Sequence, residues 1–391
     1  MDEKKIRTLL SFLRDLKTPL KLLPLLLSIV ITLIRRIAEQ DRTPSVTVLN
    51  RSFLCRKGAA FPAGCISPCV TECDGGCFAA AYACLELQNN QAQSSICVVR
   101  SRDCDSLGSA PKRTVYTSPL SPENITLTDT AFGLFLCWEN RGGRSFAAPK
   151  AFGKAVADSL KQTALQAKTD VVKDLGWHCA LIPKDGAEPL KPLRLSIHAA
   201  QPPVKISERE LLFVTAENGK PVVSVCTLPM LETHTVTALT LPLDGNSVCL
   251  EATVAKLKNG RLATVVNLSG SLYYAFSDDL GQRWSRLRPM KIKASAPNLC
   301  VRADGTTALS YLVPNKTLSA CVRVSPDGQY VWGKERTVVS TPSADFHRPV
   351  TTPCADGFLT VCRQRFSSDR LPSALLTRWK ENSLGGIESE S

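Results

Sequence analysis

The sequence predicts an all-β fold assembled from repeated four-stranded units. From about residue 55 onward, short runs of apolar and β-branched residues alternate with turn signals, as at 211–215, 221–226, 262–266 and 359–362. A polar residue followed by glycine marks several of the turns: Asp74-Gly75, Asn218-Gly219, Asn259-Gly260, Asp304-Gly305 and Asp356-Gly357. In the second half of the chain this pattern recurs roughly every 40–50 residues, the length of one propeller blade. The expected architecture is therefore a β-propeller.

The most informative local motif is the octapeptide 277–284, which has the form Ser-x-Asp-x-Gly-x-x-Trp. Asp279 can accept hydrogen bonds from backbone N–H groups of a turn, and Ser277 can add a short local hydrogen bond. Gly281 permits a left-handed backbone, and Trp284 supplies a large apolar ring to cover the sheet. These roles are structural, so the motif predicts a fold and no reaction.

A second, degenerate copy lies one blade length later, at 325–332. Ser325, Asp327 and Trp332 keep the spacing of the first copy, whereas the glycine stands one position earlier, at Gly328. Two related motifs one repeat apart favour the propeller more strongly than either motif alone.

Composition limits the classes of partner. The chain has 391 residues, 44% of them hydrophobic, and a formal net charge of +13. The positive charge is typical of a protein that meets anionic surfaces or glycans, although a dispersed basic surface explains it equally well. The sequence has no arginine-rich block and no basic platform with interleaved aromatic residues, so it does not indicate a nucleic-acid partner.

The sixteen cysteines leave a choice between disulfides and metal. No tight Cys-x-x-Cys pair is present and the four histidines are scattered, so we expect disulfides, no metal site and no cofactor. Cysteines recur at every fourth position from Cys65 to Cys77, but Asp74-Gly75-Gly76 makes a helix there unfavourable. On a strand this spacing would place the four thiols on one face. The pairing is not deducible.

The N-terminal region predicts contact with a membrane. Six basic residues within 1–21 precede the apolar run 22–34, which Arg35-Arg36 follows. As a helix this run would span roughly 20 Å, short of a hydrocarbon layer of about 30 Å. We expect residues 1–44 to be a signal peptide, with a signal anchor and an amphipathic surface segment as alternatives. The predicted location is the secretory pathway, and then the cell surface or the medium.

The rest of the chain divides into three expected parts. Residues 45–380 would form the propeller, with a helical insertion at 150–174, and residues 381–391 a disordered tail. Four Asn-x-Ser/Thr sequons predict N-glycosylation, at Asn50, Asn124, Asn267 and Asn315.

These motifs together resemble the sialidase and trans-sialidase superfamily, and most closely its trypanosome trans-sialidase-like branch. The motif of 277–284 is similar to the Asp box of that family, and Cys249-Leu-Glu251, a Gly260-x-Leu262 turn and a strand precede it in the family's order. Pro68 with Asp74-Gly75 resembles the first blade of the family, and 346–362 the last blade. The resemblance covers most of 60–380 and implies six blades.

The resemblance also implies a set of catalytic positions, most of which this chain fills with other residues. Glu251 matches the glutamate that activates the tyrosine nucleophile of the family. Ile66 stands at the first arginine position, Tyr82 at the acid/base aspartate, Asn267 at or beside the second arginine and Phe346 at the tyrosine. No residue fits the third arginine in good register, although Lys316 and Arg323 lie near it.

We therefore expect a catalytically degenerate sialidase-like glycoprotein that binds glycans or host ligands, or mediates adhesion, with sialylated or other anionic glycans as partners. The alternative is an active exo-α-sialidase or trans-sialidase with a rearranged site, in which Arg348, Arg323 and another arginine meet near Glu251. A third possibility is a structural surface-coat protein without ligand. Loss of the general acid alone would lower the rate by roughly 10²–10⁴-fold, which favours the first reading.

Overall fold

The computed structural model describes residues 45–55, 65–88, 91–118, 120–141, 174–184, 187–242, 247–314, 318–329, 331–341, 347–364 and 373–382. All of them but Asn382 belong to one compact unit, Ser45–Glu381. The expected leader or anchor at 1–44, the expected insertion except for its last residue, and the tail from 383 onward lie outside the described residues. Within the described ranges, no helix is long and apolar enough to cross a membrane.

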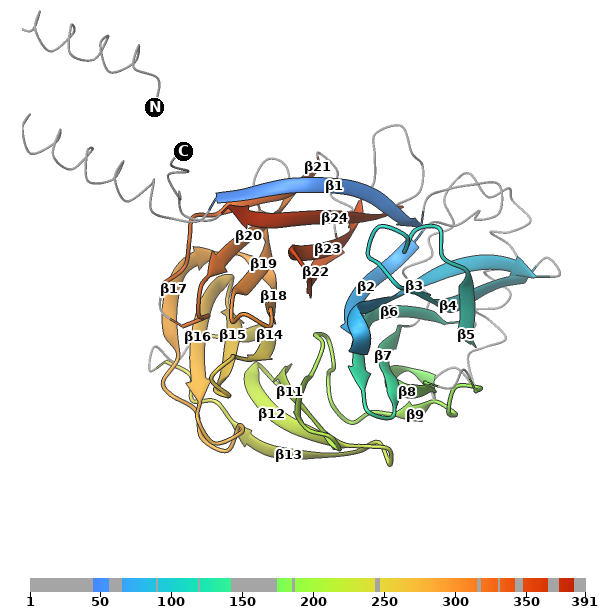
Figure 1. Ribbon diagram of the computed structural model, residues 1–391. Coiled ribbons are helices and arrows are strands. Elements are labelled where there is room, and N and C mark those ends of the chain that lie inside the picture. The colour runs from blue at the N-terminus through green and yellow to red at the C-terminus, as the bar shows by residue number, and fades with distance from the viewer. Residues whose placement is uncertain are drawn as a thin grey trace, which may run out of the picture. The chain divides into compact units, whose positions relative to one another are not determined.

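The compact unit is a six-bladed β-propeller, as the sequence predicts. Its strands form six sheets of four strands each, arranged as a ring (Figure 1). Blades one to three comprise β2 (Cys65–Cys73), β3 (Cys77–Gln88), β4 (Gln91–Ser101) and β5 (Lys112–Ser118); β6 (Ser121–Thr130), β7 (Gly133–Arg141), β8 (Gly176–Pro183) and β9 (Leu193–Arg194); and β10 (Val204–Ser207), β11 (Glu210–Glu217), β12 (Lys220–Thr227) and β13 (Glu232–Ala238).

Blades four to six follow the same order around the ring. They comprise β14 (Cys249–Lys256), β15 (Leu262–Leu268), β16 (Ser271–Ser277) and β17 (Arg288–Lys293); β18 (Ser295–Val301), β19 (Thr307–Pro314), β20 (Leu318–Ser325) and β21 (Arg336–Thr341); and β22 (His347–Cys354), β23 (Gly357–Gln364) and β24 (Ser373–Asn382), with β1 (Ser45–Cys55) as the fourth strand. The polar-glycine turns expected from sequence all lie between consecutive strands of one blade.

The two ends of the described chain complete the sixth blade. Its strand order is β1-β24-β23-β22, so the first strand of the chain adds to the last one and closes the ring by hydrogen bonds (Figure 1). Strand β24 runs to Asn382, and Glu381 forms an ion pair with Arg302. Residues 381 and 382 of the expected tail therefore belong to strand β24.

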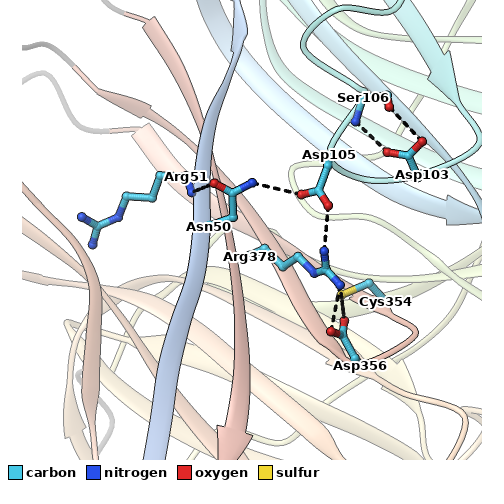
Figure 2. Close-up of polar contacts among 8 residues, drawn as sticks. All are labelled: Asn50, Arg51, Asp103, Asp105, Ser106, Cys354, Asp356 and Arg378. Atoms are coloured by element: carbon cyan, nitrogen blue, oxygen red, sulfur yellow. Dashed lines mark hydrogen bonds and ion pairs between the residues drawn. The ribbon is translucent and has the colours of Figure 1, made fainter.

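A polar network joins the sixth blade to the first blade beside this closure (Figure 2). Arg378 on β24 donates from Nη2 to both carboxylate oxygens of Asp356, each at 2.8 Å, and from Nη1 to Asp105 Oδ2 at 2.7 Å. Asn50 on β1 donates from Nδ2 to the other oxygen of Asp105 at 3.2 Å. Asp105 lies between β4 and β5 of the first blade. The guanidinium of Arg378 therefore links the sixth blade to the first blade.

The two Ser-Asp-Gly-Trp motifs form hairpin turns with the expected contacts. In the first, between β16 and β17, Asp279 Oδ1 accepts from the Arg283 N–H at 2.8 Å, and Ser277 Oγ accepts from the Gly281 N–H at 2.9 Å. The Trp284 indole donates to the Gly281 carbonyl at 3.0 Å and packs against the core between the third and fourth blades.

The degenerate copy, between β20 and β21, repeats this pattern in spite of its displaced glycine. Ser325 Oγ accepts from the Gly328 N–H at 2.9 Å, and Asp327 Oδ1 accepts from the Gln329 N–H at 2.9 Å. Trp332 packs against the core between the fourth and fifth blades. Each motif thus places a tryptophan between its own blade and the preceding one.

The inner strands face a problem of hydrogen bonding, because each has a neighbouring strand on one side only. Backbone donors on the free side lie in the interior of the ring and need acceptors. All six inner strands, β2, β6, β10, β14, β18 and β22, carry a register shift against the second strand of their blade. Such irregularities turn backbone and side-chain groups away from the regular ladder.

Side chains of the preceding blade supply several of these acceptors. The Asn124 N–H donates to Ser67 Oγ at 3.0 Å, and the Glu72 N–H to Thr352 Oγ1 at 2.9 Å. We call these contacts, with the three described next, the axial bonds.

The other axial bonds connect the last three blades. The Thr351 N–H donates to Asn298 Oδ1 at 2.8 Å. The Leu299 N–H donates to Thr253 Oγ1 at 3.2 Å, and the Ala296 N–H to Glu251 Oε2 at 2.5 Å. In every axial bond the donor belongs to one blade and the acceptor to the blade before it, so the bonds join neighbouring blades near the axis.

None of the fifteen cysteines whose side chains the structure describes forms a disulfide, in contrast to the expectation. Most are buried and pack as small apolar side chains in the blade cores. The sulfur atoms of Cys84 and Cys97 lie 3.6 Å apart, whereas a disulfide needs about 2.05 Å. Burial raises the pKa of several of these thiols, that of Cys69 to about 12, which disfavours the reactive thiolate.

The run of cysteines at every fourth position also differs from expectation. Cys65, Cys69 and Cys73 lie in β2, but the turn Asp74–Gly76 reverses the chain. Cys77 on β3 lies opposite Cys73 in the register of the two strands. The four thiols therefore do not lie along one strand.

The first motif yields a test of how a blade is held against its neighbour. Gly281 has φ +92, and a Cβ at this position would lie 2.4 Å from Cδ1 of the buried Leu212 in the third blade. Gly260 has φ +85 with no atom within 4 Å of its Cβ position, so it is a matched control for backbone strain. We expect Gly281→Ala to lower the free energy of unfolding by about 1–3 kcal/mol more than Gly260→Ala, because only the first substitution overpacks the core. Denaturant unfolding of both variants measures this difference, and equal losses would contradict it.

Candidate functional site

Charged and amide side chains gather where the inner strands begin. We call this group the central polar cluster; its members are Glu123, Asn124, Glu139, Arg141, Glu251, Asn267 and Arg348. Near the start of β6, β14 and β22 lie Asn124, Glu251 and Arg348, respectively. The cluster thus joins blades that are far apart in the sequence.

One half of the cluster is centred on Asn124. This residue has φ 51 at the irregularity of β6 and is buried, which turns its side chain out of the regular strand alternation. Its Nδ2 donates to Glu139 Oε2 at 2.6 Å, and the same carboxylate oxygen accepts from Arg141 Nε at 2.8 Å. Arg141 also pairs with Glu123 at 3.3 Å. The amide of Asn124 is therefore held by side chains of its own blade.

The other half is centred on Glu251. Its Oε2 accepts from the Ala296 N–H at 2.5 Å and from Asn267 Nδ2 at 3.1 Å. Asn267 is held in turn, because its Oδ1 accepts from the Gly270 N–H at 2.8 Å. Asn267 lies opposite Glu251 in the register of β14 and β15, which explains why these two side chains meet.

Arg348 connects the two halves. Its Nη2 donates to Asn124 Oδ1, and its charge interacts favourably with the carboxylates of Glu251, Glu139 and Glu123. Burial lowers the pKa of Arg348 from its ordinary value, while these carboxylates oppose that shift and Arg141 adds to it. The guanidinium nevertheless stays charged at any physiological pH, because an arginine pKa begins above 12.

The family-derived positions are only partly brought together. Glu251 and Asn267 meet in the cluster, whereas Ile66 and Tyr82 are buried in the hydrophobic core of the first blade. Phe346 lies outside the described residues. Arg323 on β20 donates to Tyr311 Oη at 3.0 Å and so is engaged with the second strand of its blade.

A rearranged sialidase site would require three arginines near Glu251, and the structure does not show this arrangement among the described residues. Among the described residues, two arginines, Arg348 and Arg141, belong to the cluster, and Arg323 does not join them. The three glutamates of the cluster outnumber its two arginines, so the site carries an excess of negative charge. A sugar carboxylate would have to compete with these glutamates for both guanidinium groups.

Two of the four expected glycosylation sites are buried in the folded chain. Asn124 and Asn267 are 7% and 1% exposed, and both amides donate to glutamates of the cluster. A glycan on either would not fit this fold, which corrects the expectation from the sequons. Asn50 is exposed on β1, and Asn315 lies outside the described residues.

Sequence reasoning missed the roles of Glu123, Glu139 and Arg141. They lie in the part of the chain where the family resemblance is weak, and no motif separates them from ordinary strand residues. Arg348 was recognisable only through its position beside Phe346. The left-handed backbone of Asn124 leaves no signal in a single sequence. Its Asn-x-Thr sequon predicts a glycosylation site instead.

Chemically, the cluster offers hydrogen-bond donors and acceptors to a polar ligand. Its carboxylates can accept from hydroxyl groups, and its guanidinium and amide groups can donate. No group of three or more His, Cys, Asp or Glu side chains in the described part of the chain is arranged to hold a metal ion.

Comparison with known proteins supports the fold alone. No family model matches the sequence, and no curated protein matches it either. Among solved structures, a Dyadobacter fermentans protein of unknown function has a TM-score of 0.63 at 12% identity, with 86% of this chain and 99% of that chain covered. The NanB sialidase of Streptococcus pneumoniae, in complex with 2-[(3-chlorobenzyl)ammonio]ethanesulfonate, has a TM-score of 0.56 at 10% identity, with 83% and 70% covered. The chain therefore has a sialidase-like β-propeller fold.

The position of Glu251 generates a second prediction. Removing its carboxylate leaves the buried Ala296 N–H and the Asn267 amide without their acceptor. We expect Glu251→Ala to lower the free energy of unfolding by about 1–3 kcal/mol, and Glu251→Gln to lower it less, because glutamine keeps an acceptor oxygen. Glu208→Ala, at an exposed turn, is the control for loss of a carboxylate. If Glu251→Ala is as stable as the control, Glu251 does not hold these donors.

Proposed function

We propose that this protein is a glycan-binding module on a sialidase-like propeller, and that it does not hydrolyse the glycans it binds. The observation that carries the proposal is the double hydrogen bond to Glu251 Oε2 from the Ala296 N–H and Asn267 Nδ2. A carboxylate held in this way joins two blades and is poorly placed to accept a proton from a nucleophile.

The surroundings of Glu251 support the same conclusion. The positions that resemble the family's first arginine and its acid/base aspartate hold Ile66 and Tyr82, both packed in the core of the first blade. A glycosidase without its general acid loses roughly 10²–10⁴-fold in rate from that group alone. What remains at the axis is a set of hydrogen-bonding groups that suits the hydroxyls of a sugar.

The proposal also covers the family branch that the protein resembles and its location in or outside the cell. The resemblance to trypanosome trans-sialidase-like proteins rests on the order of the sequence motifs. The proposed surface or secreted location rests on the basic and apolar N-terminal segment and on the exposed Asn50 sequon. The described thiols, none of which forms a disulfide, weigh against a disulfide-stabilised secreted protein, because thiols persist most readily in reducing compartments. Adhesion would follow from glycan binding at a cell surface.

An active sialidase with a rearranged centre is the competing function. The observation in its favour is the electrostatic interaction of Glu251 with Arg348 in the central polar cluster. Against it, both arginines of the described cluster already contact glutamates or asparagine.

Two assays on the purified protein separate these functions. We expect release of the fluorophore from a fluorogenic sialoside to stay at the buffer rate while a bacterial sialidase turns it over, and we expect binding on a glycan array. Arg348→Lys keeps the charge but loses the planar fork, so we expect about tenfold weaker binding of the selected glycan. Enzyme-like turnover that Glu251→Gln abolishes would refute the proposal, as would the absence of binding to any glycan.

A further inference from the structure

A second candidate site lies on the flank of the fourth blade. A cavity of about 490 Å³ opens there beside the first Ser-Asp-Gly-Trp turn. Its lining includes three arginines and two aromatic rings of the blade: Arg261, Arg283, Arg288, Tyr274 and Phe276. These residues come from the turn before β15, from β16, and from β17 and the turn before it. We call the cavity the flank pocket. It does not belong to the central polar cluster.

The floor of the flank pocket is aromatic and rigid. Tyr274 and Phe276 lie two residues apart on β16, so both point to the same face of the sheet, and their ring centroids are 5.5 Å apart at 60°. The guanidinium of Arg261 lies 5.1 Å from the centre of the Phe276 ring. This arginine is fixed by two hydrogen bonds to Asp278, at 2.6 and 2.9 Å.

The positive charge of the flank pocket is only partly balanced. Asp278 pairs with Arg261, and Asp279 pairs with Arg283 at 2.8 Å. Arg288 is exposed and forms no ion pair within the described ranges. It lies directly opposite Tyr274 in the β16–β17 ladder, so its side chain stands on the same face as the aromatic floor. One uncompensated guanidinium thus lies beside an aromatic ring.

We propose that the flank pocket binds one acidic sugar unit, a carboxylated or sulfated saccharide. The aromatic floor suits the apolar face of a sugar ring, and Arg288 can donate a pair of hydrogen bonds to its anionic group. The remaining carboxylate lone pairs of Asp278 and Asp279 can accept from sugar hydroxyls. Because only one guanidinium is uncompensated, the pocket suits a ligand with a single anionic group better than the closely spaced phosphates of an oligonucleotide.

The inference is independent of the proposed function, because it uses no group of the central polar cluster. The central polar cluster has an excess of carboxylates, whereas the flank pocket has an excess of guanidinium groups. Acidic sugars should therefore prefer the flank pocket.

Calorimetric titration of the full-length protein tests the proposal with three ligands of equal length: a sulfated oligosaccharide, a uronic-acid oligosaccharide and a neutral one. We expect at least one acidic ligand to bind, with an affinity that falls as salt rises. We expect Arg288→Ala to weaken this binding at least tenfold and Arg288→Lys to weaken it less.

Controls make the result specific to the flank pocket. Arg209→Ala removes the same charge at an exposed turn of the third blade that does not line the flank pocket, and should change the affinity by less than about twofold, because salt screens an exposed charge outside the pocket. The proposal is wrong if neither acidic ligand binds, if the neutral ligand binds equally well, if Arg288→Ala has no effect, or if a single-stranded oligonucleotide binds more tightly than both acidic saccharides.

Discussion

The structure depends on how backbone donors at the axis of the propeller are satisfied. Each blade offers the ring one inner strand with an unpaired side, and a buried N–H group without an acceptor costs about 1–3 kcal/mol. The axial bonds meet this requirement with oxygens of serine, threonine, asparagine and glutamate side chains from the preceding blade. Because the inner strands are irregular where they meet, these bonds need particular side chains at particular positions. The interior of the ring is thus specified by polar groups as well as by apolar packing.

This requirement changes the interpretation of Glu251. On sequence alone it resembles a catalytic glutamate, and the structure places it at the axis beside Arg348. Its hydrogen bond from the Ala296 N–H, however, has the same form as the bond that Asn298 makes to Thr351. A carboxylate at this position can therefore stabilise the fold without taking part in catalysis. The same reasoning applies to Asn124, whose backbone N–H bonds to Ser67 of the first blade and whose side-chain oxygen accepts from Arg348 of the sixth blade.

The fold was predictable from sequence because its signals are local and repeated. The polar-glycine turns, the spacing of the strands and the two Ser-Asp-Gly-Trp motifs each report on a few neighbouring residues, and the structure confirms the six-bladed propeller that they predict. The closing of the ring by β1 was not predictable, since it joins residues more than three hundred positions apart. The disulfide prediction was wrong because cysteine count does not distinguish buried thiols from paired ones. At the site, Glu251 was found through a motif, whereas Arg141 and Glu139 depend on long-range geometry.

Residue-resolved hydrogen exchange of the native protein tests the central claim most directly. The amides of Glu72, Asn124, Ala296, Leu299 and Thr351 should exchange as slowly as amides in the middle strands of the blades, because each donates to a side chain of the preceding blade. If these five amides exchange as fast as those in exposed turns, the axial bonds do not hold the ring together, and the structural role assigned to Glu251 fails with them.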